Sequence, residues 1–288
     1  MKILVTGVTG KLGAIVIETL LETVPASDLA VSVRNPEKAE SLRARGVDVR
    51  HGDFDQPETL DKAFAGIDRI LIVSTDGDNE TRIRQHGAAV AAAQRANVGF
   101  IAYTSLGKAS ENPIFLAPVH RATEEAIKNT GIPYSFLRNN WYLENEISSI
   151  QAVLGGAPWL TSAGSGKVGW ATRRDYAQAA AAVLAGEGHE NTVYELSGKP
   201  ATQEELASIL AGVLGREVPV QQVDDATYAS IMGSAGVPEP VVPILVGIQS
   251  AIREGALEVE SNDFQKLLGR PATPIEEGLR QIVSEIQS

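Results

Sequence analysis

The segment from Gly7 to Gly13 constrains the fold more than any other part of the chain. Gly7, Gly10 and Gly13 form a G-x-x-G-x-x-G pattern. It follows an apolar run at residues 2–6 and precedes residues 12–24, where apolar side chains recur at helical spacing. Glycine lets a backbone turn tightly between two elements. The chain therefore opens with a strand, a glycine turn and a helix.

Short apolar runs and helical patterns alternate through the first two thirds of the chain. Continuous apolar runs are typical of strands in a parallel sheet that helices cover on both faces. The predicted strands lie at residues 2–6, 29–33, 47–51, 69–73, 100–104 and 134–137. After about residue 200 the alternation weakens, and a proline-rich segment precedes an apolar helical run at 244–252. The pattern predicts an α/β fold, a doubly wound Rossmann-type parallel sheet with a smaller, mostly helical C-terminal lobe.

The same pattern predicts how the chain divides between sheet and lobe. We expect residues 1–138 to form the sheet core and residues 167–198 to return to it. Residues 139–166 and 199–288 then form the smaller lobe. In such sheets ligands bind beyond the carboxyl ends of the strands, where the strand order reverses. We therefore expect a ligand site at this end of the sheet, with the lobe beside it.

Three pairs of residues have the spacing of a capping box, in which the first residue caps the start of a helix. They are Asp55 with Glu58, Thr202 with Glu205, and Thr273 with Glu276. Pro274 also stands where the first residue of the third helix is expected. We predict that a helix begins at each of these positions.

The composition narrows the classes of partner and compartment. A net charge of −11 argues against a nucleic-acid partner, because such binding depends on clustered lysine and arginine. The chain has no cysteine, which excludes disulfides and thiolate metal sites. No run of about eighteen apolar residues occurs, and Lys2 leads directly into a strand pattern. We expect a cytoplasmic monomer or homodimer with no membrane, nucleic-acid or metal partner.

The glycine turn has the chemistry of an anion site. Glycines let the backbone approach a pyrophosphate, and the following helix offers free N–H groups and a favourable dipole. Its place between a strand and a helix supports this interpretation, although the spacing is not G-x-G-x-x-G. We predict that a dinucleotide lies across Gly7–Gly13 and contacts Thr9, Lys11 and Leu12. A glycine-rich turn without a ligand is the alternative.

The end of the second strand indicates which dinucleotide binds. An NAD site usually places an acidic residue here to hold the ribose 2′-hydroxyl. This chain has Arg34 instead, and a guanidinium can pair with a 2′-phosphate. NADPH is therefore the predicted cofactor, and Lys11 and Lys38 either assist its binding or are solvated surface cations. The alternative for Arg34 is a solvated loop cation.

Polar residues also follow the third, fourth and fifth predicted strands. Asp53 stands where a carboxylate can accept a hydrogen bond from the adenine amino group, with Phe54 beside it, or it stabilises a turn. Ser74 and Thr75 follow the fourth strand, and Thr104 and Ser105 stand at the end of the fifth. All four lie where the dinucleotide must pass, and all four also resemble ordinary polar strand ends. The predicted cofactor-binding residues are Gly7, Thr9, Gly10, Lys11, Leu12, Gly13, Arg34, Asp53, Phe54, Ser74, Thr75, Tyr103, Thr104 and Ser105.

Three later segments carry a family resemblance. They are Val119-His-Arg-Ala-Thr-Glu-Glu125, Leu137-Arg-Asn-Asn-Trp-Tyr-Leu-Glu-Asn145 and Leu268-Gly-Arg-Pro-Ala-Thr-Pro274. With the opening glycine turn and Asp53, they resemble the NmrA-like branch of the atypical short-chain dehydrogenase/reductases. Within that branch they resemble the bacterial type 2 NADPH:quinone oxidoreductases and triphenylmethane reductases. The resemblance spans essentially the whole chain.

The chain departs from the broader family at one functional position. Short-chain dehydrogenases usually carry Tyr-x-x-x-Lys before the sixth strand, but residues 115–127 contain no such pair. If the register holds, Leu116 and His120 occupy the two places, and Ser105 alone is kept from the usual Ser-Tyr-Lys set. This departure argues against alcohol–ketone interconversion, because the alkoxide would form without a positioned acid.

The resemblance implies an oxidoreductase that passes hydride from NADPH directly to a quinone or a similar flat conjugated acceptor. Such acceptors take a hydride without a strong acid, and neither flavin nor metal is required. The alternative is a redox sensor that binds NADP(H) without turnover, as some NmrA-like proteins do. An isomerase or epimerase lacks the same acid–base pair and ranks last.

The resemblance also suggests catalytic and substrate-binding residues. His120 and Ser105 are the catalytic candidates, and His120 could protonate a reduced quinone oxygen or serve as a structural hydrogen-bonding residue. The predicted substrate-binding residues are Phe115, Asn139, Asn140, Trp141 and Tyr142. Their rings offer stacking area for a flat acceptor, and the alternative is an aromatic cluster that packs the lobe. Trp159 and Trp170 are predicted core residues.

Overall fold

A seven-stranded parallel sheet forms the centre of the computed structural model, which describes residues 1–288. The strand order is β11-β6-β5-β4-β1-β2-β3, and every pairing in this sheet is parallel. The strands are β1 (Ile3–Thr6), β2 (Leu29–Val33), β3 (Asp48–His51), β4 (Arg69–Ile72), β5 (Phe100–Leu106), β6 (Tyr134–Asn139) and β11 (Thr192–Leu196). The order reverses between β1 and β4, which confirms the predicted doubly wound sheet.

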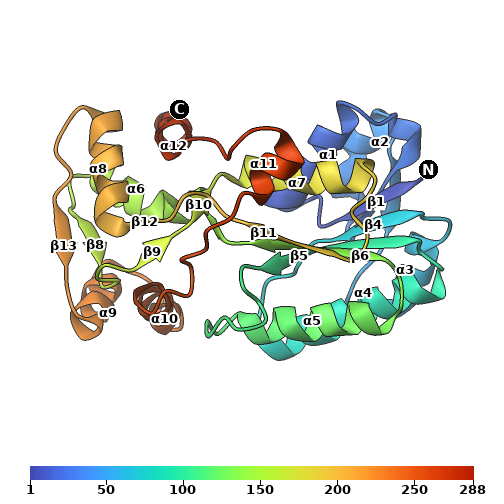
Figure 1. Ribbon diagram of the computed structural model, residues 1–288, viewed down its shortest axis with the longest axis horizontal. Coiled ribbons are helices and arrows are strands. Elements are labelled where there is room, and N and C mark those ends of the chain that lie inside the picture. The colour runs from blue at the N-terminus through green and yellow to red at the C-terminus, as the bar shows by residue number, and fades with distance from the viewer.

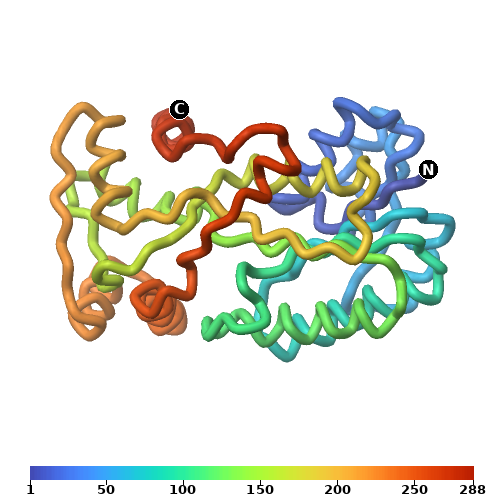
Figure 2. Tube along the Cα trace, in the orientation of Figure 1, coloured from blue at the N-terminus to red at the C-terminus, as the bar shows by residue number.

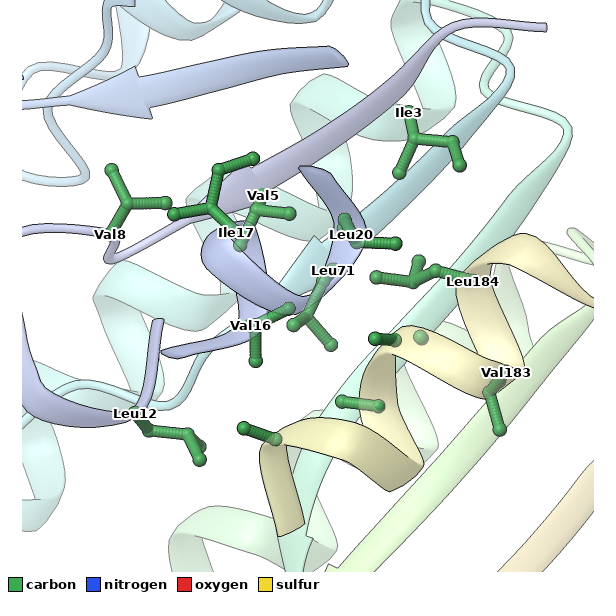
Figure 3. Packing of buried hydrophobic residues seen from close by; sticks show 14 of the residues in the cluster. Ile3, Val5, Val8, Leu12, Val16, Ile17, Leu20, Leu71, Val183 and Leu184 are labelled. Atoms are coloured by element: carbon green, nitrogen blue, oxygen red, sulfur yellow. The ribbon is translucent and has the colours of Figure 1, made fainter. Parts of the chain in front are cut away.

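Helices cover both faces of this sheet (Figure 1). One face carries α1 (Lys11–Leu21), α2 (Glu40–Ala44), α7 (Arg173–Ala185) and α11 (Asp263–Leu268). The other face carries α3 (Pro57–Phe64), α4 (Asn79–Arg95) and α5 (Ala117–Asn129). Apolar side chains of α1 and α7 meet over β1 and β4, as Leu20, Leu71 and Leu184 show in Figure 3. Each face of the sheet therefore has its own apolar core.

The smaller lobe lies at one end of the molecule and has a separate core. Its helices are α6 (Ile147–Leu154), α8 (Gln203–Leu214), α9 (Asp225–Ser234), α10 (Val242–Arg253) and α12 (Ile275–Gln287). Three strand pairs join them: β7 (Trp141–Tyr142) with β10 (Trp170–Ala171), β8 (Trp159–Thr161) with β13 (Val220–Gln222), and β9 (Lys167–Val168) with β12 (Ala201–Thr202). Short 3-10 turns are η1 (Ala26–Asp28), η2 (Pro36–Ala39) and η3 (Leu143–Glu146). Trp159 and Trp170 are each 1% exposed in this core, which confirms both as core residues.

The chain passes repeatedly between sheet and lobe (Figure 2). The segment that holds α11 returns from the lobe, and Phe264 of α11 packs edge-on against Tyr176 of α7 at 5.2 Å between ring centroids. Two further contacts fix this segment, because Arg270 and Thr273 both bind the buried carboxylate of Asp175. We propose that residues 1–138 and 167–198 form the core and that 139–166 and 199–288 form the lobe. Two departures accompany this division: α11 is docked onto the core, and β9 and β10 pair with strands of the lobe.

One of the three predicted capping boxes is present. Thr202 caps α8 and Glu205 returns the hydrogen bond. Helices also begin within two residues of Asp55 and Thr273, as predicted, but the capping role is wrong for both. The N-cap positions of α3 and α12 are Gln56 and Pro274, and neither makes a side-chain cap hydrogen bond. The Asp55 carboxylate instead accepts from Arg84 and Gln85, and Thr273 donates to Asp175. No helix of the chain combines the length and the apolar character that a membrane span requires.

Candidate functional site

A groove of about 700 Å³ lies at the carboxyl end of the sheet, where the strand order reverses. Residues from the ends of β1, β2, β3 and β4 line it, together with Tyr142, Asn145 and Arg173 from the lobe side. This is the position at which open α/β sheets bind ligands. The groove runs from Arg34 at one end, across the glycine turn, to Tyr142 at the other.

The glycine turn requires glycine for two separate reasons. Gly7 has a φ of +66°, a left-handed conformation that other residues rarely adopt. A side chain at Gly13 would place its Cβ 2.4 Å from the Gly7 carbonyl oxygen. The turn leads into α1, whose first turn has no side-chain cap and no acidic residue. Its N–H groups are therefore available to an anion.

Arg34 and Lys11 line the sheet side of the groove without a carboxylate partner. Arg34 follows β2 and is exposed, and neither Arg34 nor Lys11 forms an ion pair or a side-chain hydrogen bond within the chain. The Arg34 charge helps to hold the pKa of Asp55 below its usual range, after the larger effects of hydrogen bonds from Arg84 and Gln85. Lys38 does not line the groove.

Two buried polar atoms on the groove wall lack partners. They are the Ser32 hydroxyl oxygen and the Gln85 side-chain carbonyl oxygen. Such atoms destabilise a fold unless something hydrogen-bonds to them. Gly52 stands against Ser32, because a Cβ there would lie 2.1 Å from the hydroxyl. The wall is therefore shaped for a bound molecule that carries hydrogen-bonding groups.

Asp53 and Phe54 also line the groove, and Asp53 stabilises its own turn. One Asp53 carboxylate oxygen accepts from the Asp55 N–H at 3.0 Å. The two interpretations of Asp53, a ligand contact and a turn residue, are therefore compatible.

The polar residues after β4 and at the end of β5 separate into two layers. Ser74 and Thr75 line the groove. Thr104 lies behind them, and its hydroxyl accepts from the Ser74 N–H at 2.8 Å. Ser105 is buried and donates to Glu124 at 2.6 Å. The structure thus brings the β4 residues to the groove and leaves the β5 residues in the wall behind it.

His120 lies in a buried polar cluster with Tyr103. Its Nδ1 is 2.9 Å from the Tyr103 hydroxyl, and its Nε2 accepts from the Arg82 guanidinium at 3.4 Å. Burial, and then the nearby Arg82 charge, lower the pKa of His120 to about 3. Since arginine can only donate, Nε2 carries a lone pair and the imidazole is neutral at neutral pH.

Among the predicted substrate residues, Tyr142 alone lines the groove. Asn139 donates to the Tyr142 hydroxyl at 3.1 Å and so supports it from behind. Asn140 is buried and donates to Ser197 and to the Leu257 carbonyl. Trp141 turns to the lobe core and donates to Glu146, whereas Phe115 is 42% exposed outside the groove. The segment after β6 therefore presents one ring to the groove and uses its other members for packing.

Comparison with known proteins places the chain in a family. The model of the NmrA-like family matches residues 1–273. The chain belongs to the NmrA-like family. It is 40% identical to quinone oxidoreductase 2 of Escherichia coli K12, over 97% of this chain and 98% of that protein. It is also 29% identical to the NAD(P)H azoreductase of Xenophilus azovorans, over 94% of each chain.

Solved structures of relatives share the whole fold of this NmrA-like protein. Triphenylmethane reductase of Citrobacter sp., complexed with NADP(H), superposes with a TM-score of 0.94 at 46% identity, covering 98% of this chain and 100% of that one. The NADPH-dependent quinone oxidoreductase QOR2 of Escherichia coli, complexed with NADPH, gives a TM-score of 0.93 at 39% identity, covering 98% and 99%.

The groove of this NmrA-like protein also contains residues that the sequence analysis missed. They include Ser32, Asp55, Asp76, Gln85, Asn145 and Arg173. Arg173 opens α7 and holds its guanidinium 5.2 Å from the centroid of the Tyr142 ring. The sequence does signal the start of this helix, because Thr172 caps it three residues before Asp175. That signal does not reveal that α7 points its first turn at the groove.

Proposed function

We propose that this NmrA-like protein is an NADPH-dependent reductase that transfers hydride directly to a quinone or a similar flat conjugated acceptor. The observation that carries this proposal is the groove, with an unpaired arginine at one end, an open helix start in the middle and a tyrosine ring at the other end. The relatives named as quinone, azo-dye and triphenylmethane reductases support the same class of acceptor.

The residues present fit NADPH. Arg34 would hold the 2′-phosphate, and the N–H groups at the start of α1 would hold the diphosphate. The unpartnered Ser32 and Gln85 oxygens would gain hydrogen bonds from the adenosine half of the cofactor. The cofactor supplies the hydride when it is bound. No flavin or metal is required for this chemistry.

On the acceptor side, the protein contributes alignment. Tyr142 is supported from behind by Asn139 and is covered by the Arg173 guanidinium, so its ring has a fixed orientation. A fixed ring at the end of the groove can orient a flat acceptor for transfer, which is a major source of rate. His120 is neutral and Ser105 is bound to Glu124, so we propose that water supplies the proton.

Turnover with a simple benzoquinone tests the function. The pure protein, NADPH and the quinone should give a steady loss of cofactor absorbance, and NADH should give a much slower reaction. An Arg34→Ala variant serves as the matched control, because it should lose the preference for NADPH. Cofactor binding without turnover over a panel of quinones, azo dyes and cationic dyes would contradict the proposal.

A redox sensor is the second candidate, and the commitment of His120 and Ser105 to internal hydrogen bonds favours it. A sensor requires a macromolecular partner that binds the NADP⁺ and NADPH forms with different affinity. Equal partner binding to both forms would exclude this candidate.

We further propose that the protein works in the cytoplasm as a monomer or homodimer and binds no nucleic acid. The net charge of −11 supports the last point. Light scattering of the purified chain measures its oligomeric state, and a larger assembly would contradict the proposal.

A further inference from the structure

A buried cluster of polar side chains lies beside the groove and has no part in the function proposed so far. It contains Arg82 and His86 of α4, Tyr103 of β5, and His120 and Thr123 of α5. His86 connects it to the groove, because its Nε2 accepts from the N–H of Thr75, a groove residue, at 3.0 Å. The cluster therefore lies directly behind the groove wall.

Arg82 is the unusual member of this cluster. Its side chain is buried, with the residue 6% exposed, yet no carboxylate forms an ion pair with it. Its only hydrogen bond is the 3.4 Å contact from Nη2 to His120, and its Nε is buried without a partner. Asp76 on the groove wall acts on Arg82 through its charge without forming an ion pair. Arg82 is thus a buried positive charge with too few partners.

The position of Arg82 in α4 adds to the cost of burying its charge. It lies in the first turns of the helix, where the helix dipole is positive and disfavours a cation. An arginine stays protonated in proteins, so the fold cannot avoid this cost by releasing a proton. Buried charges of this kind are destabilising unless they are paired. A bound molecule that carries negative charge would supply the partner that Arg82 lacks.

Arg82 also lies at the correct place for an acceptor. It does not line the groove itself, but its cluster meets the groove wall at Thr75, which His86 contacts, and at Asp76, whose charge acts on Arg82. His120, its hydrogen-bond partner, lies in the first turns of α5. Arg82 therefore lies between the starts of two helices at the carboxyl edge of the sheet, where the reacting end of the dinucleotide is expected.

We propose that Arg82 is the fixed positive charge of the acceptor site and stabilises the anion that forms when a neutral acceptor receives hydride. This inference rests on the proposed reductase function. A neutral quinone takes two electrons and one proton as hydride from NADPH, which becomes NADP⁺. The quinone becomes a hydroquinone monoanion, and a proton from water then gives the hydroquinone. From behind the groove wall, the charge of Arg82 stabilises that anion and replaces the positioned acid that the chain lacks.

The charge of the acceptor then decides which substrates the protein prefers. A neutral quinone becomes negative on reduction, whereas a cationic triphenylmethane dye becomes neutral. A fixed positive charge stabilises the first product and repels the second substrate. The structure thus assigns this protein to neutral, electron-poor acceptors in preference to cationic dyes.

Rates with the two acceptors measure the role of Arg82. The variant Arg82→Met removes the charge and keeps a long side chain. We expect its kcat with a neutral benzoquinone to fall roughly 10- to 100-fold, the effect of one unit charge at a distance of several ångströms. Its kcat with a cationic triphenylmethane dye should be unchanged or higher, and its Kd for NADPH should change less than about twofold. Arg82→Lys should keep part of the quinone rate.

Arg95→Met is the matched control, because Arg95 lies in the last turn of the same helix and pairs with Asp61 at the surface. It should leave both rates unchanged. Equal losses with the two acceptors in Arg82→Met would overturn the inference and leave the reductase function intact. No reduction of either acceptor by the unchanged protein would overturn both.

Discussion

Arg34 and Arg82 carry the same charge and neither has a carboxylate partner, yet they lie in opposite environments. Arg34 is exposed at the adenosine end of the groove, where water solvates its charge. Arg82 is buried behind the other end and makes one long hydrogen bond. Without a ligand, an exposed charge hardly changes the stability of the fold, because water solvates it. A buried charge without a partner lowers that stability until a ligand binds. The comparison shows that one groove uses both arrangements.

The largest effect is expected from a substitution in the glycine turn. The turn lies between the two arginines, so a cofactor that cannot cross it cannot reach both ends of the groove. In Gly13→Ala the new Cβ would lie 2.4 Å from a backbone oxygen, so the turn must shift. We expect NADPH affinity to fall by more than about 100-fold, together with a loss of stability of about 3 kcal/mol. Calorimetric titration and urea unfolding measure the two effects.

Gly87→Ala is the control for this change, since nothing lies within 4 Å of a Cβ there. It should leave binding and stability unchanged or slightly improve the helix. Tight NADPH binding by Gly13→Ala would mean that the cofactor does not lie across the turn.

Removal of Arg34 should affect one cofactor only. In Arg34→Ala we expect NADPH affinity to fall roughly 10- to 100-fold, because a charge-assisted contact of about 1.5–3 kcal/mol is lost. NADH affinity should be nearly unchanged, and so should the free energy of unfolding. Lys38→Ala, outside the groove, is the control. Equal losses for the two cofactors would show that Arg34 does not contact the 2′-phosphate.

Acid should lower the stability contributed by the buried cluster of Arg82, His86 and His120. It should not change the charge of the exposed Arg34. Burial, and then Arg82, lower the pKa of His86 to about 4 and that of His120 to about 3, from a reference value of 6.5. Below pH 6.5 the two imidazoles therefore bind protons in the unfolded chain but not in the folded chain. Stability should be highest above this pH and fall by up to about 1.4 kcal/mol per pH unit for each histidine, down to about pH 4 for His86 and about pH 3 for His120.

Two measurements check this dependence. Urea unfolding between pH 8 and pH 4 gives the slope, and nuclear magnetic resonance follows each imidazole. The signals of His86 and His120 should not titrate above about pH 5. Titration of His120 near pH 6.5 would exclude the buried arrangement of the cluster.

The smallest expected effect concerns stability at neutral pH. Arg82→Met replaces an unpaired buried charge with an apolar chain, so Tm should be unchanged or slightly higher. Thermal unfolding of this variant beside Arg34→Ala sharpens the comparison, since neither should lose stability. A large fall in Tm for Arg82→Met would indicate a structural role. Because the two sites are separate, their effects on kcat/KM should multiply in the double variant.

Features that depend on local pattern could be predicted from the sequence. The apolar runs predicted the sheet, and the glycine spacing predicted the turn at which its order reverses. Thr202 and Glu205 formed a capping box because both partners lie within one helical turn. Asp55 and Thr273 did not, because each is bound by residues distant in sequence. Local pattern contains no information about such competition.

The sequence also could not predict which polar residues line the groove and which lie in the wall behind it. Ser74 and Thr104 both follow apolar strands, but Ser74 lines the groove and Thr104 supports it from behind. Arg82 was missed because its neighbours Glu80, Thr81 and Arg84 make the segment resemble an exposed helix face. Arg82 is buried because other elements pack over it. The periodicity of a single sequence does not indicate such packing at one position of an otherwise polar helix start.

The docking of α11 onto α7 and β11 has a consequence for how the molecule comes apart. Phe264 fills a place in the sheet core although the helices before and after α11 belong to the lobe. A fragment that stops near residue 200 would uncover that place, so neither region can be cut away cleanly. Heating should therefore melt sheet and lobe together in a single cooperative transition.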